Sequence, residues 1–164
     1  MITMMLLNEP VEKFARKALF YVDENATVSD AVRVMKENQA ISVFIKKEGR
    51  VVGILTYKDI IFRVIGEGIN PAQVKVASVM SSPVLSVKVG DSIGNALDMM
   101  SKHNIRRLLV VDESGAPYGI LVEKQVEGDL IESSQKTRAC GVKQKSWLER
   151  HILEVSEDVI RSRH

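Results

Sequence analysis

One pattern of apolar and polar positions is present twice along this chain. A helical stripe, with apolar residues at spacings of three and four, spans residues 28–35 and returns over residues 93–100. Thr27 and Ser92 directly precede the two stripes and can cap them, and Asp30 can complete a capping box with Thr27. The pattern predicts two amphipathic helices. Their core-facing residues are Val28, Ala31, Val32 and Met35 in the first copy and Ile93, Ala96, Leu97 and Met100 in the second.

Short apolar segments around each helix predict strands. One precedes each helix, at 19–22 and 84–87, and two follow it, at 43–45 with 51–55 and at 108–111 with 117–122. Charged turns containing Gly49 or Gly115 join the paired strands as hairpins. Each copy closes with a second helical stripe, formed by Ile60, Val64 and Ile65 or by Val126, Leu130 and Ile131. Each copy therefore reads β-α-β-β-α.

The repeat sets the expected domain organisation. Breakers between residues 66 and 77, among them Gly68 and Pro71, separate the copies. A unit of this size buries little core alone, so we expect the two to pack face to face with pseudo-twofold symmetry in an α/β (α+β) fold. The predicted domains are 11–70 and 76–133. Residues 134–164 are predicted to be a basic linker (134–145) and a C-terminal helix over 146–161.

The sequence resembles a known family at the entry to the last helix of the first copy. A tandem β-α-β-β-α repeat in which Gly53-Ile54-Leu55-Thr56-Tyr57-Lys58-Asp59 leads into that helix closely resembles the CBS-domain pair, or Bateman module. Asn25-Ala26-Thr27-Val28, Val79-Met80 and His103-Asn104-Ile105-Arg106-Arg107-Leu108 also agree with the family pattern. The resemblance runs from about Val11 to Ser133.

The resemblance implies that the paired units bind AMP, ADP, ATP, S-adenosylmethionine or a related adenosyl ligand between them. Thr56 and Asp59 occupy the family's Gly-x-x-Thr-x-x-Asp pattern. A carboxylate can accept hydrogen bonds from ribose hydroxyls, and a threonine at a helix start can donate to phosphate. The adenine would be held mainly by backbone groups. By analogy with the family, these groups lie near Ala18, Leu19 and Phe20 and near Ile41, Ser42 and Val43.

Thr-x-x-Asp at a helix start is also an ordinary capping box that needs no ligand. The glycine, the strand and the repeat around it favour ligand contact. The second copy carries Val122 and Gln125 at the matching positions, and valine cannot donate to phosphate, so one strong site is expected.

Arg106 and Arg107 stand where the first copy has Ile41 and Ser42. In the family geometry this strand entrance approaches the ligand held by the other unit, so an arginine there could pair with phosphates. Adjacent strand positions point to opposite faces. We therefore expect one of the two arginines to make the contact, and the sequence leaves open which one.

Charge, cysteine content and the lack of known motifs limit the kinds of site that the chain can contain. The net charge of +2 comes from residues 133–164, which carry +3. The single cysteine, Cys140, excludes an intramolecular disulfide and fits a reducing, cytoplasmic setting. The apolar start, Met1 to Leu7, is too short for a signal peptide or a membrane span. No spacing typical of a metal site or of a catalytic motif occurs, so neither a metal nor an enzymatic activity is expected.

The expected function is therefore non-catalytic sensing of an adenosyl ligand, with no obligatory cofactor. The resemblance also implies a homodimer, because such modules commonly pair into flat discs. One alternative is an adaptor with a vestigial cleft that docks an unidentified effector protein. Another is nucleic-acid binding through the tail, which is weaker because no aromatic residues are interleaved. The basic residues in question are Lys136, Arg138, Lys143 and Lys145.

Overall fold

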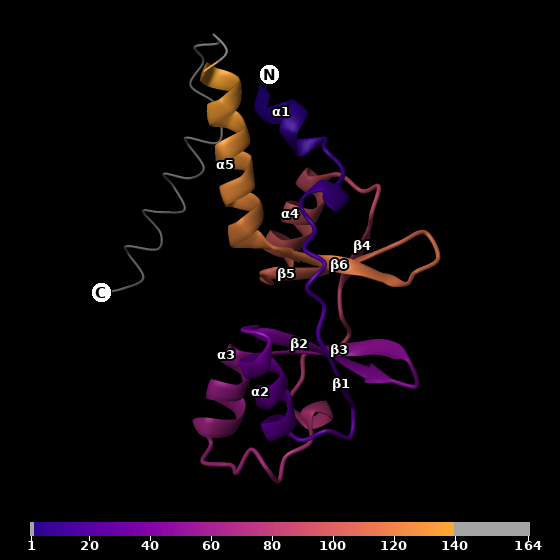
Figure 1. Cartoon of the computed structure of the whole chain (residues 1–164), viewed down its shortest axis with the longest axis vertical. Coiled ribbons are helices and arrows are strands. Elements are labelled where there is room, and N and C mark those ends of the chain that lie inside the picture. The colour runs from indigo at the N-terminus through magenta and orange to yellow at the C-terminus, as the bar shows by residue number, and fades with distance from the viewer. Residues whose placement is uncertain (1, 140–164) are drawn as a thin grey trace, which may run out of the picture.

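The computed structural model describes the backbone of residues 2–139 and the side chains of residues 5–135. Within that range it contains two units stacked along the long axis of the molecule (Figure 1). The first unit comprises β1 (Tyr21–Asp23), α2 (Val28–Glu37), β2 (Ser42–Lys47), β3 (Arg50–Thr56), α3 (Tyr57–Ile60) and the π-helical turn η2 (Ile61–Ile65). The second comprises β4 (Ser86–Lys88), α4 (Ile93–Lys102), β5 (Arg107–Val111), β6 (Pro117–Val122) and α5 (Glu123–Ala139). The predicted α+β repeat is confirmed.

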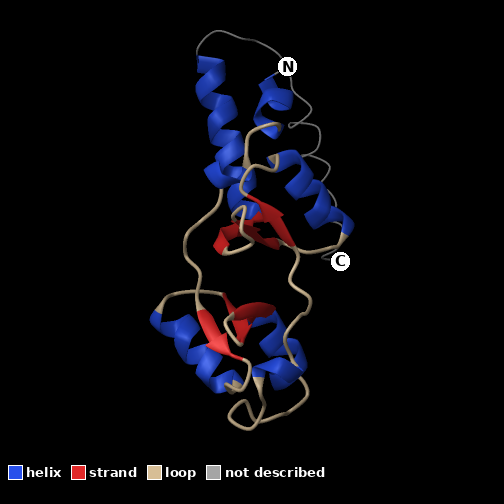
Figure 2. Ribbon diagram, turned by 90° about the vertical axis from the view of Figure 1, so that its right-hand side faces the viewer, coloured by secondary structure: helices blue, strands red, loops and turns tan. Residues whose placement is uncertain are grey.

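Each unit of the described chain is built on a three-stranded sheet of the same topology. The short first strand pairs in parallel with the second, and the second pairs antiparallel with the third. The hairpin turns contain Gly49 and Gly115, whose φ angles of 80° and 84° favour glycine. The first strands begin at Tyr21 and Ser86, two residues later than the sequence predicts. The sheets face each other, and the helices lie on their outer sides (Figure 2).

The predicted capping residues begin the two long helices. Thr27 and Asp30 form a complete capping box at α2, and the Ser92 hydroxyl accepts from the Asn95 amide at α4. Two predicted core positions are wrong. Val32 is 41% exposed and Ile65 is 55% exposed, because each lies at the outer edge of its stripe and the sheet covers only the inner side. The remaining stripe residues are buried or half-buried.

The hydrophobic core of each unit includes residues from the segment that precedes the other unit in the sequence. Val11 and Phe14 belong to the second core, whereas Val76 and Val79 belong to the first. Hydrogen bonds in both directions join the backbones of Arg16 and Ile120, at 2.9 Å each. Ser81 and Ile54 are joined in the same way, at 2.9 and 3.0 Å. The boundaries 11–70 and 76–133 stay predictions, and the two units are interleaved in space.

An apolar cluster joins the two sheets. Phe44 from β2 and Leu109 and Ile120 from the second sheet are each at most 6% exposed and pack together. Partly buried residues from both units surround them, namely Leu19, Tyr21, Val51, Ile54, Val84, Val111 and Val122. The predicted face-to-face packing is therefore observed, and this contact brings the strand-to-helix junction of one unit near the strand entrance of the other.

The helices at the two ends of the described chain differ from the prediction. The sequence did not predict α1 (Ile2–Leu7), which contacts α4 and α5. Residues 134–139, predicted to be linker, instead continue α5, because the first helix breaker after Gly128 is Gly141. The predicted helix over 146–161 lies outside the described residues. No helix in the described part of the chain combines the length and the apolar character needed to cross a bilayer.

Candidate functional site

Thr56 and Asp59 lie together at the junction of β3 and α3, and they form a capping box. The Thr56 amide and hydroxyl donate to Oδ2 of Asp59 at 2.9 and 2.7 Å, and the Asp59 amide donates to the Thr56 hydroxyl at 3.3 Å. Oδ1 of Asp59 lies 3.6 Å from the Arg63 guanidinium. The hydroxyl proton of Thr56 is thus already donated, so donation to a phosphate would require this hydrogen bond to break.

The same box occurs at Thr27 and Asp30, where no ligand is expected. Its three hydrogen bonds are 3.0, 2.8 and 3.1 Å long. The hydrogen bonds from Thr27 lower the pKa of Asp30. Capping geometry alone therefore does not identify a ligand site. The surroundings differ, because the Asp59 side chain is 15% exposed and that of Asp30 is 41% exposed.

The strand entrance of the second unit supplies the group that sets Asp59 apart. Arg107, at the start of β5, is half-buried, and Tyr57 and Asp59 of the first unit are among the groups that affect its pKa. Burial lowers the pKa of Arg107; Tyr57 opposes that effect, the neighbouring Arg106 adds to it, and Asp59 opposes it least. The charge of a carboxylate in one unit thus acts on a guanidinium of the other, and no ion pair joins the two groups in the described part of the chain.

Arg106 is directed elsewhere. It is exposed, and its Nε lies 4.0 Å from a carboxylate oxygen of Glu123 at the start of α5. The two adjacent arginines therefore have different surroundings, as alternation along a strand requires. Of the pair, Arg107 is the half-buried one, and its pKa responds to Tyr57 and Asp59 of the first unit.

The residues predicted around the adenine are spread over three environments. Leu19 lies in the apolar cluster between the sheets, Phe20 packs on the first core, and Ala18 is exposed. The Phe20 carbonyl accepts from the Phe44 amide at 2.8 Å, so it is already engaged. Of the three residues, Leu19 is therefore the one that packs in the contact between the two sheets.

The second predicted segment lies beside Thr56. Ile41 is 51% exposed, and its carbonyl accepts from the Tyr57 amide at 3.0 Å. Ser42 is half-buried and pairs in register with Thr56. The Val43 side chain is fully buried in the first core, so any ligand contact there must involve its backbone.

The matching junction of the second unit has a different character. Val122 pairs in register with Arg107 and packs in the apolar cluster between the sheets. Gln125 is exposed on the first turn of α5. A valine in apolar contact replaces the capping threonine, so this junction lacks the hydroxyl–carboxylate pair of the first.

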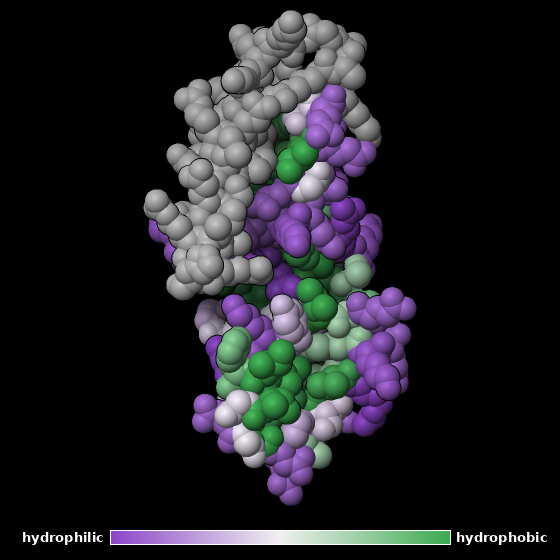
Figure 3. Space-filling view, turned by 90° about the vertical axis from the view of Figure 1, so that its left-hand side faces the viewer, coloured by the Kyte–Doolittle hydropathy of each residue, from purple (hydrophilic) through white to green (hydrophobic). Residues whose placement is uncertain are grey.

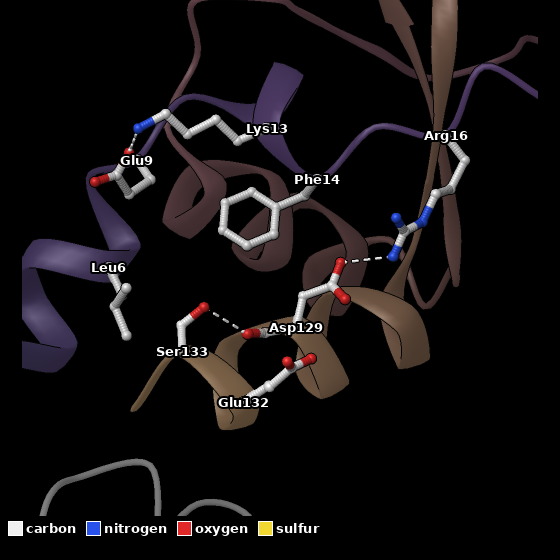
Figure 4. Close-up of a pocket in the computed structure, with 8 residues that line it drawn as sticks. All are labelled: Leu6, Glu9, Lys13, Phe14, Arg16, Asp129, Glu132 and Ser133. Atoms are coloured by element: carbon white, nitrogen blue, oxygen red, sulfur yellow. Dashed lines mark hydrogen bonds and ion pairs between the residues drawn. The ribbon is translucent and has the colours of Figure 1, made fainter. Parts of the chain in front are cut away.

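A polar hollow of about 450 Å³ lies elsewhere, between the N-terminal segment and α5 (Figure 4). Its charged groups pair with one another, Lys13 with Glu9 and Arg16 with Asp129 at 2.7 Å. Sequence patterns do not predict this hollow, because no local pattern shows that residues 6–16 pack on the last helix. It is lined by Leu6, Glu9, Lys13, Phe14, Arg16, Asp129, Glu132 and Ser133.

Comparison with known proteins identifies the repeated unit. The family model described as CBS domain matches residues 11–66 and 76–126. The CBS domain-containing protein YhcV of Bacillus subtilis is 30% identical over 120 residues, which are 73% of this chain and 81% of YhcV. An uncharacterized protein of Methanopyrus kandleri is 30% identical over 117 residues, and the match spans 71% of this chain and 60% of that protein. A crystal structure of an uncharacterized conserved protein from Pyrococcus horikoshii superposes with a TM-score of 0.68 at 27% identity, covering 85% of this chain and 98% of that one.

Proposed function

The chain belongs to the CBS-domain family and carries two CBS domains in tandem, and from this premise we propose that it is a regulatory module, not an enzyme, which binds an adenosine-containing ligand at the Thr56–Asp59 junction. A CBS-domain pair is a regulatory type of module. The ligand and the position of its site are the proposal.

The observation that carries the proposal is that the strand positions beside the two groups, Asp59 and Arg107, meet between the sheets. Ile54, two residues before Thr56, and Val122, which pairs in register with Arg107, belong to one apolar cluster. Within the described part of the chain, Oδ1 of Asp59 interacts with the Arg63 guanidinium at 3.6 Å and accepts no hydrogen bond, so it has lone pairs left to accept from ribose hydroxyls. Arg107 can pair with an anionic group attached to that ribose. The two side chains together match a molecule with a sugar diol at one end and an anion at the other.

The chemistry of these groups defines a class of ligand. AMP, ADP, ATP and S-adenosylmethionine all carry a ribose for Asp59 and an anionic group for Arg107, phosphate in three cases and carboxylate in the fourth. An aromatic ring beside Leu19 would add apolar contact. The specific adenosyl compound is left to experiment.

Regulation follows from the position of the junction between units. A ligand that contacts Asp59 of one unit and Arg107 of the other stabilises the arrangement in which both contacts are made, and so shifts the population toward it. Helix α5 begins directly after β6, whose Val122 pairs in register with Arg107. We therefore expect α5 to transmit the shift.

The test is thermal unfolding of the pure protein with AMP, ADP, ATP, S-adenosylmethionine and GTP as a control. A ligand present at a hundred times its dissociation constant should stabilise the fold by about 2.7 kcal/mol. Asp59→Ala should abolish the ligand-dependent shift. Asp30→Ala removes an equivalent capping box and should retain it, so the pair separates ligand contact from loss of the helix cap.

An unchanged shift in Asp59→Ala would place the ligand elsewhere. The absence of a shift with any adenosyl compound would contradict the proposal and favour an adaptor that docks an effector protein.

A further inference from the structure

Arg63 lies one helical turn after Asp59 and contacts two parts of the molecule. Its Nη2 lies 3.6 Å from Oδ1 of Asp59. Its Nη1 donates to the backbone carbonyls of Val79 and Met80, at 2.9 and 3.4 Å, in the segment that leads into the second unit. One guanidinium therefore joins the carboxylate of the candidate site to the chain between the two units.

Arg63 is the one charged residue of η2. The rest of this turn is apolar, and Ile61, Phe62 and Ile65 are exposed. Hydrophobic residues gather on this side of the first unit (Figure 3). The Arg63 side chain is half exposed, so it is not needed to fill the core. The ion pair of η2 with Asp59 and its side-chain hydrogen bonds to the inter-unit segment are therefore all made by Arg63.

The segment that Arg63 contacts is also bonded to the strand that leads into the candidate site. We call residues 79–82 the crossing segment. Backbone hydrogen bonds of 2.9 and 3.0 Å join Ser81 and Ile54 in both directions, and the Ser82 hydroxyl donates to the Val52 carbonyl at 2.8 Å. Both acceptor residues belong to β3. The crossing segment is thus held on β3 and, through Arg63, on η2, before the chain continues into the second unit.

The second unit makes a related contact with the charges exchanged. Asp129 occupies the position in α5 that Arg63 has in η2. Its Oδ2 pairs at 2.7 Å with Arg16, which lies in the segment that leads into the first unit. The residue that replaces Asp59 in this unit is Gln125, which carries no charge. Of the two contacts, that of Arg63 is therefore the one that includes the carboxylate of the candidate site.

The shape of the guanidinium connects its two contacts. Its N–H donors lie in one rigid plane, so ordering one nitrogen also orders the other. The 3.6 Å separation from Asp59 exceeds the length of a hydrogen bond, whereas the 2.9 Å contact with Val79 does not. A ribose hydroxyl that donates to Oδ1 of Asp59 leaves a lone pair on that oxygen for Nη2. A bound ribose would thus order the carboxylate, the guanidinium and the Val79 carbonyl together.

We propose that Arg63 is a positioning residue that couples ligand binding at Asp59 to the crossing segment. The inference rests on the proposed function, because it takes Asp59 as the acceptor of the ribose hydroxyls. Arg63 lies outside the Gly-x-x-Thr-x-x-Asp pattern and acts through Asp59, not on the ligand itself. The crossing segment then responds to the ligand in addition to α5.

Hydrogen–deuterium exchange of the full chain, with and without saturating AMP, ADP, ATP or S-adenosylmethionine, tests this coupling. The amides of Met80 and Ser81 report on the crossing segment, because they donate to the carbonyls of Val76 and Ile54 at 2.9 Å. In the wild type, the compound that binds should slow their exchange by about fivefold or more, the lower end of typical coupling between sites.

Three variants separate coupling from simple stabilisation, each compared at saturation as measured by calorimetry. Arg63→Met should still bind the compound, because the Thr56 amide and hydroxyl hold Oδ2 of Asp59, but the compound should no longer slow the two amides. Arg63→Lys keeps the charge and lacks the rigid fork, so it should behave as Arg63→Met does. Asp129→Asn removes the equivalent contact of the second unit and should keep the slowing seen in the wild type.

The outcomes distinguish this inference from the proposed function. If the compound still slows the two amides in Arg63→Met or Arg63→Lys, Arg63 only stabilises the crossing segment, and the inference is wrong while the ligand site stands. Binding to the wild type without any change in these amides leads to the same conclusion. A wild type that binds none of the four compounds contradicts the proposed function and the inference together.

Discussion

The backbones of Arg16 and Ile120 form a two-way bridge in which each amide donates to the carbonyl of the other residue at 2.9 Å. Arg16 precedes the first unit in sequence, and Ile120 lies in the last strand of the second. The bridge holds the N-terminal segment against that sheet and inserts Phe14 into the second core. The second unit therefore depends on residues at the opposite end of the described chain.

This close approach explains the glycine at position 119. A Cβ there would lie 2.8 Å from the Arg16 carbonyl oxygen, which is fixed by the bridge. Gly119→Ala should therefore destabilise the protein by about 1–3 kcal/mol, a typical cost of overpacking. At the equivalent Gly53, a Cβ would meet the flexible Met80 side chain instead, so Gly53→Ala should cost less. Urea unfolding of both variants measures the difference, and equal losses would contradict the explanation.

The sequence predicts much of this fold because the information is local and occurs twice. The caps at Thr27 and Ser92 and the glycine turns specify the helices and hairpins without reference to the rest of the chain. The insertion of Phe14 into the second core was not predicted, because it joins segments with no shared pattern. The exposure of Val32 and Ile65 was not predicted for a related reason. The spacing of apolar residues shows which side of a helix is buried, but it does not show how much of that side the sheet covers.

The candidate site was predictable in part. The sequence places Thr56 and Asp59 together because a capping box fixes both residues within one helical turn. It left open whether Arg106 or Arg107 faces them, because the face of a strand depends on its register in the sheet. The pairing of Arg107 with Val122 supplies that register. This register cannot be predicted from neighbouring residues in the sequence, because it joins two different strands.

The pKa of Asp30 is lowered by hydrogen bonds from the Thr27 amide and hydroxyl, so the ionised form stabilises the fold. That contribution is present above the ordinary aspartate pKa near 3.9 and is lost as the pH falls through the lowered folded-state value. Asp30→Asn should therefore lower the unfolding midpoint at pH 7, and the gap to wild type should narrow as the pH falls below about 4. A gap that does not change with pH would contradict this cause.

The reciprocal change uses the second helix. Asn95 occupies the position in α4 that Asp30 has in α2, and its backbone amide donates to the Ser92 hydroxyl at 3.2 Å. Asn95→Asp should install a full capping box and raise the unfolding temperature at pH 7, because a carboxylate accepts more strongly than an amide oxygen. Thermal unfolding at pH 7 and pH 3 provides the comparison, and the gain should be present only at the higher pH.

The different surroundings of Arg106 and Arg107 lead to a prediction about binding. Arg107→Ala should weaken the adenosyl ligand by about ten- to a hundredfold, the value of one or two charge-assisted hydrogen bonds. Arg106→Ala should change affinity little, because its guanidinium lies toward Glu123. Isothermal titration calorimetry with each variant measures the effect. Adenosine, which lacks an anionic group, should bind wild type and Arg107→Ala equally, and an equal loss for adenosine would show that Arg107 acts by holding the units together.

The absence of a threonine–aspartate pair from the second junction predicts one strong site per chain, and this asymmetry can be reversed. Val122→Thr with Gln125→Asp would restore the pair at the start of α5. The opposing strand entrance carries Ile41 and Ser42 in place of arginines, so Ile41→Arg or Ser42→Arg is needed as well to hold an anion. Calorimetry should give one site for wild type and two for the triple variant that contains Ser42→Arg, because Ser42 pairs with Thr56 as Arg107 pairs with Val122. If Ile41→Arg creates the second site instead, Arg106 and not Arg107 is the residue that supports the natural one.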